Sequence, residues 1–102
     1  MQMTATDRAK KNDAMRQRLP ATKGRDKFVV TSSVAFMGPE TIAKAIKTVR
    51  DFADFSEAND PYGEHDFGSF ELDGEKFFWK IDYYDGQEGI DNLLTLMLAS
   101  DY

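Results

Sequence analysis

The sequence predicts a two-layer α+β domain, in which helices cover a three-stranded antiparallel sheet built around a central β-hairpin. Three observations predict this fold. Asp73-Gly74 lies between two aromatic-rich runs, which is the strongest short-range hairpin signal. The run Phe28–Phe36 alternates apolar and polar residues, as a half-buried strand does. Apolar residues repeat at helical spacing after Pro39 and again after Gly89. The expected order of elements is α–β–α–β–β–α.

The first expected element is a helix over Asp7–Leu19, which ends before Pro20 because the residue preceding a proline avoids helical geometry. Its apolar stripe is thin, so we expect a marginal helix that needs a partner surface. The stripe consists of Ala9, Met15 and Leu19. We therefore divide the chain into a basic N-terminal arm, residues 1–26, and a single α+β domain, residues 27–102.

A strand and an amphipathic helix follow the arm. The strand is predicted over Phe28–Phe36 with one buried face, interrupted at Ser32. Gly38-Pro39-Glu40 opens the helix, since proline in the first position and an acid in the first turn both suit a helix start. Its apolar stripe contains Ile42, Ala45, Ile46, Val49, Phe52 and Ala53. A charged loop, Asp54–Glu64, comes next.

The hairpin Asp66–Tyr84 has a register fixed by its two-residue turn. Gly68 then faces Trp79, which leaves room for the indole, and Glu71 faces Lys76. One face carries Phe70, Leu72, Phe77, Trp79, Ile81 and Tyr83, and the other carries Phe67, Glu71, Lys76, Phe78, Lys80, Asp82 and Tyr84.

A loop over Asp85–Gly89 leads to a last expected helix, with Ile90, Leu93, Leu94, Met97 and Leu98 on one stripe. The second and third helices should pack on the aromatic face of the sheet. Whether the first helix covers the other face stays open. If it does not, Phe67, Phe78 and Tyr84 form an exposed apolar patch of the kind that marks an interface.

Composition excludes several classes of site. The absence of cysteine excludes disulfides, thiolate zinc sites and cysteine nucleophiles. No apolar run approaches the ~20 residues of a membrane span, and the start lacks a signal-peptide core, so we expect a cytoplasmic protein without a membrane partner. Zinc-helix spacings and phosphate-cradling glycine loops are absent, and we expect no cofactor.

Charge is distributed unevenly along the chain. Residues 1–27 contain eight Lys or Arg and three Asp, a local charge of +5. Residues 51–102 contain fourteen Asp or Glu against two Lys, a local charge of −12. The arm is either a solvated tail or a separate contact, and direct contact with nucleic acid is expected only through it. The acidic body should attract basic protein surfaces, including those of nucleic-acid-binding complexes.

The residues best suited to chemistry gather in Asn59–Gly68, which contains the only histidine. If the protein is an enzyme, the catalytic candidates are Glu64, His65, Asp66 and Asp82. A histidine among carboxylates can bind a divalent metal or act as an oriented acid–base pair. Consecutive side chains in an extended segment alternate in direction, however, so Glu64, His65 and Asp66 cannot all converge on one ion without an irregular loop. We therefore predict a mainly structural role and no metal site.

Three segments resemble a family of small, uncharacterised bacterial proteins, a domain of unknown function found mainly in alphaproteobacteria. The segments are NDPYGEHDFG at Asn59–Gly68, FWKIDYYD at Phe78–Asp85 and LTLMLA at Leu94–Ala99. NDAMRQ at Asn12–Gln17 and the upstream FADF also fit, whereas Gly86–Asp91 is shorter than in the family. The resemblance implies no activity, but it implies a context of plasmid or prophage cargo near anti-restriction and partition genes.

Two classes of function follow. The first is a small acidic, non-enzymatic protein-binding module, such as an inhibitor from a mobile genetic element that imitates nucleic acid against a host defence system (anti-CRISPR or anti-restriction type). Its expected contact residues are Asp54, Glu57, Asp60, Glu64, Phe67, Phe78 and Tyr84. The second is a small metal-dependent or acid–base hydrolase centred on His65. A pocket with a shifted carboxylate pKa beside this histidine would favour the hydrolase.

Overall fold

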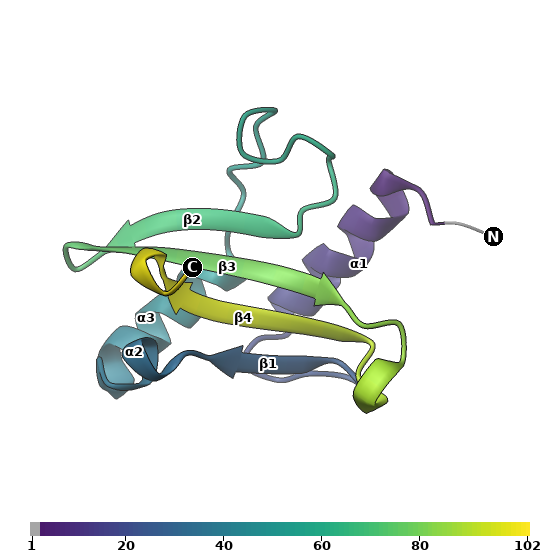
Figure 1. Ribbon diagram of the computed structural model, residues 1–102. Coiled ribbons are helices and arrows are strands. Elements are labelled where there is room, and N and C mark those ends of the chain that lie inside the picture. The colour runs from purple at the N-terminus through teal and green to yellow at the C-terminus, as the bar shows by residue number, and fades with distance from the viewer. Residues whose placement is uncertain (1–2) are drawn as a thin grey trace.

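The computed structural model describes residues 3–102, and within them three α-helices lie against a four-stranded sheet (Figure 1). The helices are α1 (Ala5–Gln17), α2 (Ser32–Ala35) and α3 (Pro39–Arg50), and the strands are β1 (Lys27–Val30), β2 (Phe67–Leu72), β3 (Glu75–Tyr83) and β4 (Asn92–Leu98). The strand order is β1-β4-β3-β2, with β1 parallel to β4 and the other pairs antiparallel. The α+β class is confirmed, but the prediction of a three-stranded, purely antiparallel sheet is wrong.

The hairpin of β2 and β3 is confirmed residue by residue. Gly68 pairs with Trp79 and Glu71 with Lys76, as the turn at Asp73-Gly74 predicts. Trp79 is fully buried, and so is Phe77 on the same face. A Cβ on Gly68 would overlap the indole and lie 2.7 Å from the Phe52 ring. The glycine therefore allows the indole to lie flat against the neighbouring strand.

The last predicted helix is wrong, because its residues form strand β4 in the middle of the sheet. Leu94 and Leu96 are fully buried in the core, and Met97, on the other face, is also buried. A central strand that is apolar on both faces produces a continuous apolar run, which also fits helical spacing. The short 3-10 turns η1 (Gln87–Gly89) and η2 (Ala99–Asp101) precede and follow the strand.

The predicted strand Phe28–Phe36 is too long. Pairing of β1 with β4 stops at Val30, and Ser32–Ala35 form the short helix α2. The hydroxyls of Thr31 and Ser33 donate to the Asp101 carboxylate at 2.7 and 2.8 Å, which holds this turn against the C-terminal residues. Phe36, expected on the buried face, is 90% exposed as a result.

Helix α1 packs beside α3 on the aromatic face of the sheet (Figure 1). Met15 of α1, and Leu19 in the turn that follows it, belong to the same buried cluster as Trp79 and Val49. The sequence treats residues 1–26 as an arm outside the domain, but this packing makes the helix part of the core. Among residues 3–102, no α-helix covers the opposite face of the sheet, where the short 3-10 turn η2 lies against β3 (Figure 1). None of the helices in this part of the chain is long and apolar enough to cross a membrane.

Candidate functional site

The segment from Asp51 to Asp66 joins α3 to β2 and projects beyond the sheet (Figure 1). Its tip is a series of tight turns, in which the Asp60 amide donates to the Ser56 carbonyl at 2.8 Å and the Gly63 amide donates to the Asp60 carbonyl at 3.1 Å. We call this segment the 51–66 loop. It contains most of the residues that the sequence marks for chemistry or for partner binding.

His65 holds the base of this loop against α1. Its Nδ1 atom lies 2.8 Å from the Asp13 carboxylate, and its Nε2 atom lies 3.7 Å from the Asp60 carboxylate. The backbone amide of His65 also donates to Asp60, at 3.3 Å. The imidazole stacks on the Phe55 ring with 3.8 Å between centroids and 4° between planes. These contacts fix the imidazole on both edges and on one face.

Arg16 of α1 is the buried cation of the same network. Its guanidinium pairs with Asp13 at 2.5 Å and donates to the carbonyls of Val49 and Phe52, each at 3.0 Å. These carbonyls lie in the last turn of α3 and just beyond it, and that of Val49 also accepts from the Phe52 amide at 3.2 Å. Arg16 therefore ties α1 to the C-terminal end of α3. Its Nε atom is buried without a partner among the described residues.

A second set of bonds joins α1 to the end of β3. The Asn12 amide donates to the Glu64 carbonyl at 2.9 Å and to the Tyr83 hydroxyl at 3.0 Å, and this hydroxyl donates to the Glu64 carboxylate at 3.1 Å. Burial raises the pKa of Tyr83 above its usual range. Burial is also the main cause that raises the pKa of Asp66, helped by the charges of Glu64 and Asp60.

The four catalytic candidates do not converge on one point. Both ring nitrogens of His65 face carboxylates, so neither is directed at open space where a substrate could bind. Asp82 pairs with Lys80 at 3.0 Å on the opposite face of the sheet. Within residues 3–102, no group of three or more His, Asp or Glu side chains is placed to hold a metal ion. The geometry of the network suits anchoring of the loop better than acid–base chemistry.

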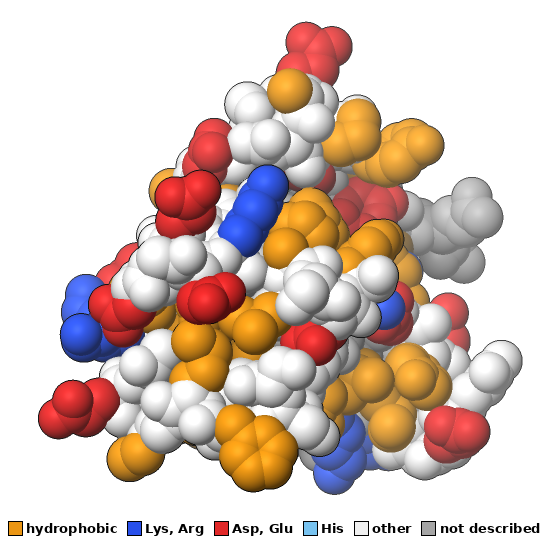
Figure 2. Space-filling model, turned by 60° about the vertical axis from the view of Figure 1, so that its left-hand side comes forward, with side chains coloured by type: hydrophobic (Ala, Val, Ile, Leu, Met, Phe, Trp, Pro, Cys, Tyr) orange, Lys and Arg blue, Asp and Glu red, His pale blue; other side chains and the backbone are white. Residues whose placement is uncertain are grey.

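The predicted partner-binding acids divide into two pairs. Asp54 and Glu57 are exposed on the loop, whereas Asp60 is buried against His65 and Glu64 is half-buried in its bond with Tyr83. Acidic side chains lie at the tip of the loop and below it in the space-filling view, with few basic ones between them (Figure 2). Only the first pair is therefore exposed to a partner, and the Asp54 carboxylate also accepts from the Asn59 amide at 3.0 Å.

The predicted aromatic contacts lie elsewhere. Phe67 and Phe78 pack against each other on the open face of the sheet, with 5.3 Å between ring centroids. The Tyr102 ring packs edge-on against both rings, and both are half-buried. Tyr84, which follows β3, is also half-buried. The fold thus separates these rings from the acidic loop by placing them over different elements.

Sequence reasoning missed Tyr62 and the residues of α1. Tyr62 is 80% exposed near the tip of the loop, where the sequence indicates only a turn. Asn12, Asp13 and Arg16 lie on one face of α1 at helical spacing, and this spacing is the signal that could have indicated a shared contact.

One comparison with known proteins gives a match. A family described as "Protein of unknown function (DUF3768)" matches residues 30–101, more than two thirds of the chain. No curated protein and no solved structure matches the chain.

Proposed function

The chain belongs to the DUF3768 family of proteins of unknown function, and from this premise we propose that it is a small acidic, non-enzymatic protein-binding module. The observation that carries the proposal is the 51–66 loop. Its base is fixed by His65, Asp13 and Arg16, while Tyr62 is 80% exposed near its tip. A loop that is already ordered loses little entropy on binding, and an exposed tyrosine is a common anchor residue of interfaces.

The proposed partner is a basic protein surface, because the exposed acids Asp54 and Glu57 lie on the same loop as Tyr62. Basic grooves that bind nucleic acid are the surfaces for which carboxylates compete with phosphates. On this proposal the protein blocks a host nucleic-acid-handling or defence protein in the cytoplasm. It would be an anti-restriction or anti-CRISPR type of inhibitor encoded by a mobile element.

The test compares partner capture by the wild type and by loop variants. Immobilised wild-type protein and the double variant Asp54→Lys/Glu57→Lys are exposed to the same bacterial lysate, and the bound proteins are identified. The control, Glu75→Lys/Glu88→Lys, makes the same change in charge at exposed acids outside the loop. We expect the wild type and the control variant to capture the same basic protein, and we expect the loop variant not to capture it.

Tyr62→Ala should weaken the same interaction by about 1–2 kcal/mol or more if this ring is an anchor. Purified partner and protein should associate more slowly as salt rises, because exposed charges act mainly on the association rate. Equal capture by the loop variant and by the wild type would remove the 51–66 loop from the interface and sink the proposal.

The alternative function, a hydrolase centred on His65, is supported by the 2.8 Å contact between His65 and Asp13 and by the raised pKa of Asp66. It is less well supported than the binding module, because both ring nitrogens face carboxylates. Hydrolysis of a generic ester or phosphoester by the wild type that is lost in His65→Gln, a variant that still folds, would favour it.

A further inference from the structure

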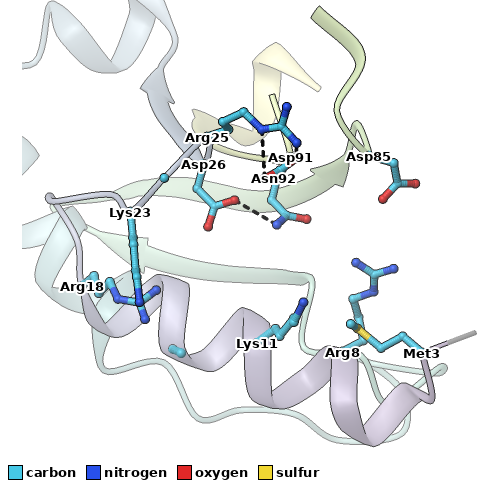
Figure 3. A pocket seen from close by; sticks show the side chains of 12 residues that line it. Met3, Arg8, Lys11, Arg18, Lys23, Arg25, Asp26, Asp85, Asp91 and Asn92 are labelled. Carbon is cyan, nitrogen blue, oxygen red and sulfur yellow. Dashed lines mark hydrogen bonds and ion pairs between the residues drawn. The ribbon is translucent and has the colours of Figure 1, made fainter. Parts of the chain in front are cut away.

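A cleft of about 820 Å³ lies between α1 and the connection from β3 to β4 (Figure 3). One wall consists of Arg8 and Lys11 of α1 and of Arg18, which caps the end of this helix (Figure 3). The other walls contain polar and charged residues from the segment before β1 and from the two strand ends: Lys23, Arg25, Asp26, Asp85, Asp91 and Asn92. Five basic residues therefore face a space shared with three acidic ones.

The acids on the far wall are largely engaged with neighbours. The Arg25 guanidinium donates to the Asp91 carboxylate at 2.8 Å, and the Asn92 amide donates to the Asp26 carboxylate at 2.9 Å (Figure 3). Among residues 3–102, by contrast, Lys11, Arg18 and Lys23 take part in no ion pair. The cleft therefore retains an excess of positive charge on its α1 side.

We propose that this cleft binds the sugar–phosphate backbone of a nucleic-acid strand. From Arg8 to Arg18 the cationic wall is roughly 15 Å long, at about 1.5 Å of rise per helical residue. Phosphates of one strand follow each other at about 3.4 Å along a duplex axis, so the wall spans several phosphates and exceeds what a single phosphate needs.

The lining also predicts how the strand is recognised. No aromatic ring is among the residues that line the cleft, so it offers no surface on which bases could stack. Lysine and arginine contacts to phosphates position a strand without reading its sequence. Binding should therefore depend strongly on salt and hardly at all on base sequence. This site is separate from the acidic loop, and the proposal stands whether or not the loop binds a protein.

The test is fluorescence anisotropy of a labelled single-stranded DNA of about twenty nucleotides, titrated with the full chain at several salt concentrations. Three or four phosphate contacts predict that the logarithm of the association constant falls with log salt at a slope of about −2 to −3. Lys11→Gln should weaken binding and make this slope shallower by about one contact. Lys10→Gln is the matched control, because Lys10 is the exposed neighbour on the same helix and does not line the cleft.

A second variant should have the opposite effect and increase the affinity for DNA. Asp85 lines the cleft and has no side-chain ion pair or hydrogen bond among the described residues, so Asp85→Asn should tighten binding. Thermal melts check that each variant is folded, and Lys11, Arg18 and Asp85 are all outside the core.

Four results would overturn the proposal: no binding by the wild type at 50 mM salt, equal losses in Lys10→Gln and Lys11→Gln, strong preference for one base sequence, or displacement of the DNA by inorganic phosphate at an equal concentration of phosphate groups. The last result would indicate a site for a single anion.

Discussion

Gly68 shows how one residue without a side chain determines the packing of the largest one. A Cβ at this position would overlap the Trp79 indole and approach the Phe52 ring to 2.7 Å. We expect Gly68→Ala to lower the free energy of unfolding by about 1–3 kcal/mol, since overpacking forces neighbours out of place. Urea unfolding measures this loss. Ser69→Ala, the next residue on the open face of the same strand, is the control and should change little. Equal stabilities of the two variants would mean that the indole shifts freely.

Asp66 supplies a prediction about pH at the same scale. Its pKa is raised above the model-compound value of 3.8, chiefly by burial, so the folded state carries this charge at a cost. Between 3.8 and the raised pKa the folded state binds more protons than the unfolded state, and the contribution of Asp66 to stability therefore falls as pH rises.

Asp66→Asn removes this cost. We expect the variant to melt at a higher temperature than the wild type near pH 7, and we expect the difference to shrink as pH falls through the raised pKa and below 3.8, where Asp66 is protonated in both states of the wild type. Thermal melts of both proteins across this range measure the effect. If the difference in melting temperature between the two proteins stays constant with pH, its cause is the change in contacts at residue 66 and not the charge of Asp66.

At the scale of elements, the sequence predicts best where local chemistry determines the structure. The turn at Asp73-Gly74 fixes the register of β2 and β3, because a one-residue slip would move every aromatic side chain to the wrong face. The start of α3 at Pro39 is equally local.

The prediction of secondary structure fails where pairing between distant segments determines the conformation. The apolar run in β4 fits a buried helix as well as a strand, and only the neighbours β1 and β3 select the strand. The same pairing ends β1 at Val30, so the alternating pattern beyond it is not used. The parallel contact of β1 with β4 joins segments far apart in the chain, and no local signal indicates it.

The N-terminal residues are more important to the core than the sequence indicates. The thin apolar stripe suggests that residues 1–20 are dispensable, but Leu19 is 2% exposed in the core and Arg16 bonds to the end of α3. We expect Leu19→Ala to cost about 2–5 kcal/mol in the free energy of unfolding, measured in urea. Arg18→Ala, at the exposed neighbour, should cost far less. Deletion of residues 1–20 should abolish cooperative unfolding, and a truncated chain that melts like the wild type would restore the view of a separate arm.

Across the whole molecule, α1 separates two surfaces of opposite character. Its Asn12, Asp13 and Arg16 face the 51–66 loop, whereas Arg8, Lys11 and Arg18 line the basic cleft. The sequence reveals both charges, the basic start and the acidic remainder, and it identifies the loop around His65. It does not reveal that the helix organises them, because this depends on packing against α3 and β3 that a thin apolar stripe does not predict.

The same charge distribution predicts how the protein responds to salt. Fourteen acidic residues against two lysines in residues 51–102 repel one another, and this self-repulsion acts against the compact state. Raising ionic strength from 0.01 to 0.15 M shortens the screening length from about 30 to about 8 Å. The ion pairs Arg25–Asp91 and Lys47–Asp51 weaken too, but exposed pairs contribute only about 0–1 kcal/mol each. We therefore expect repulsion to dominate, so that the melting temperature rises with salt.

Asp54→Lys/Glu57→Lys tests this cause directly. Each substitution of an acid by lysine changes the charge by +2, so the formal net charge moves from −5 to −1. Both residues are exposed and outside the core. The variant should melt at a higher temperature than the wild type at low salt, and it should gain less when salt is added, because less repulsion remains to be screened. If the melting temperature of the wild type falls as salt is added, the surface ion pairs outweigh the repulsion. The acidic surface would then not destabilise the folded protein.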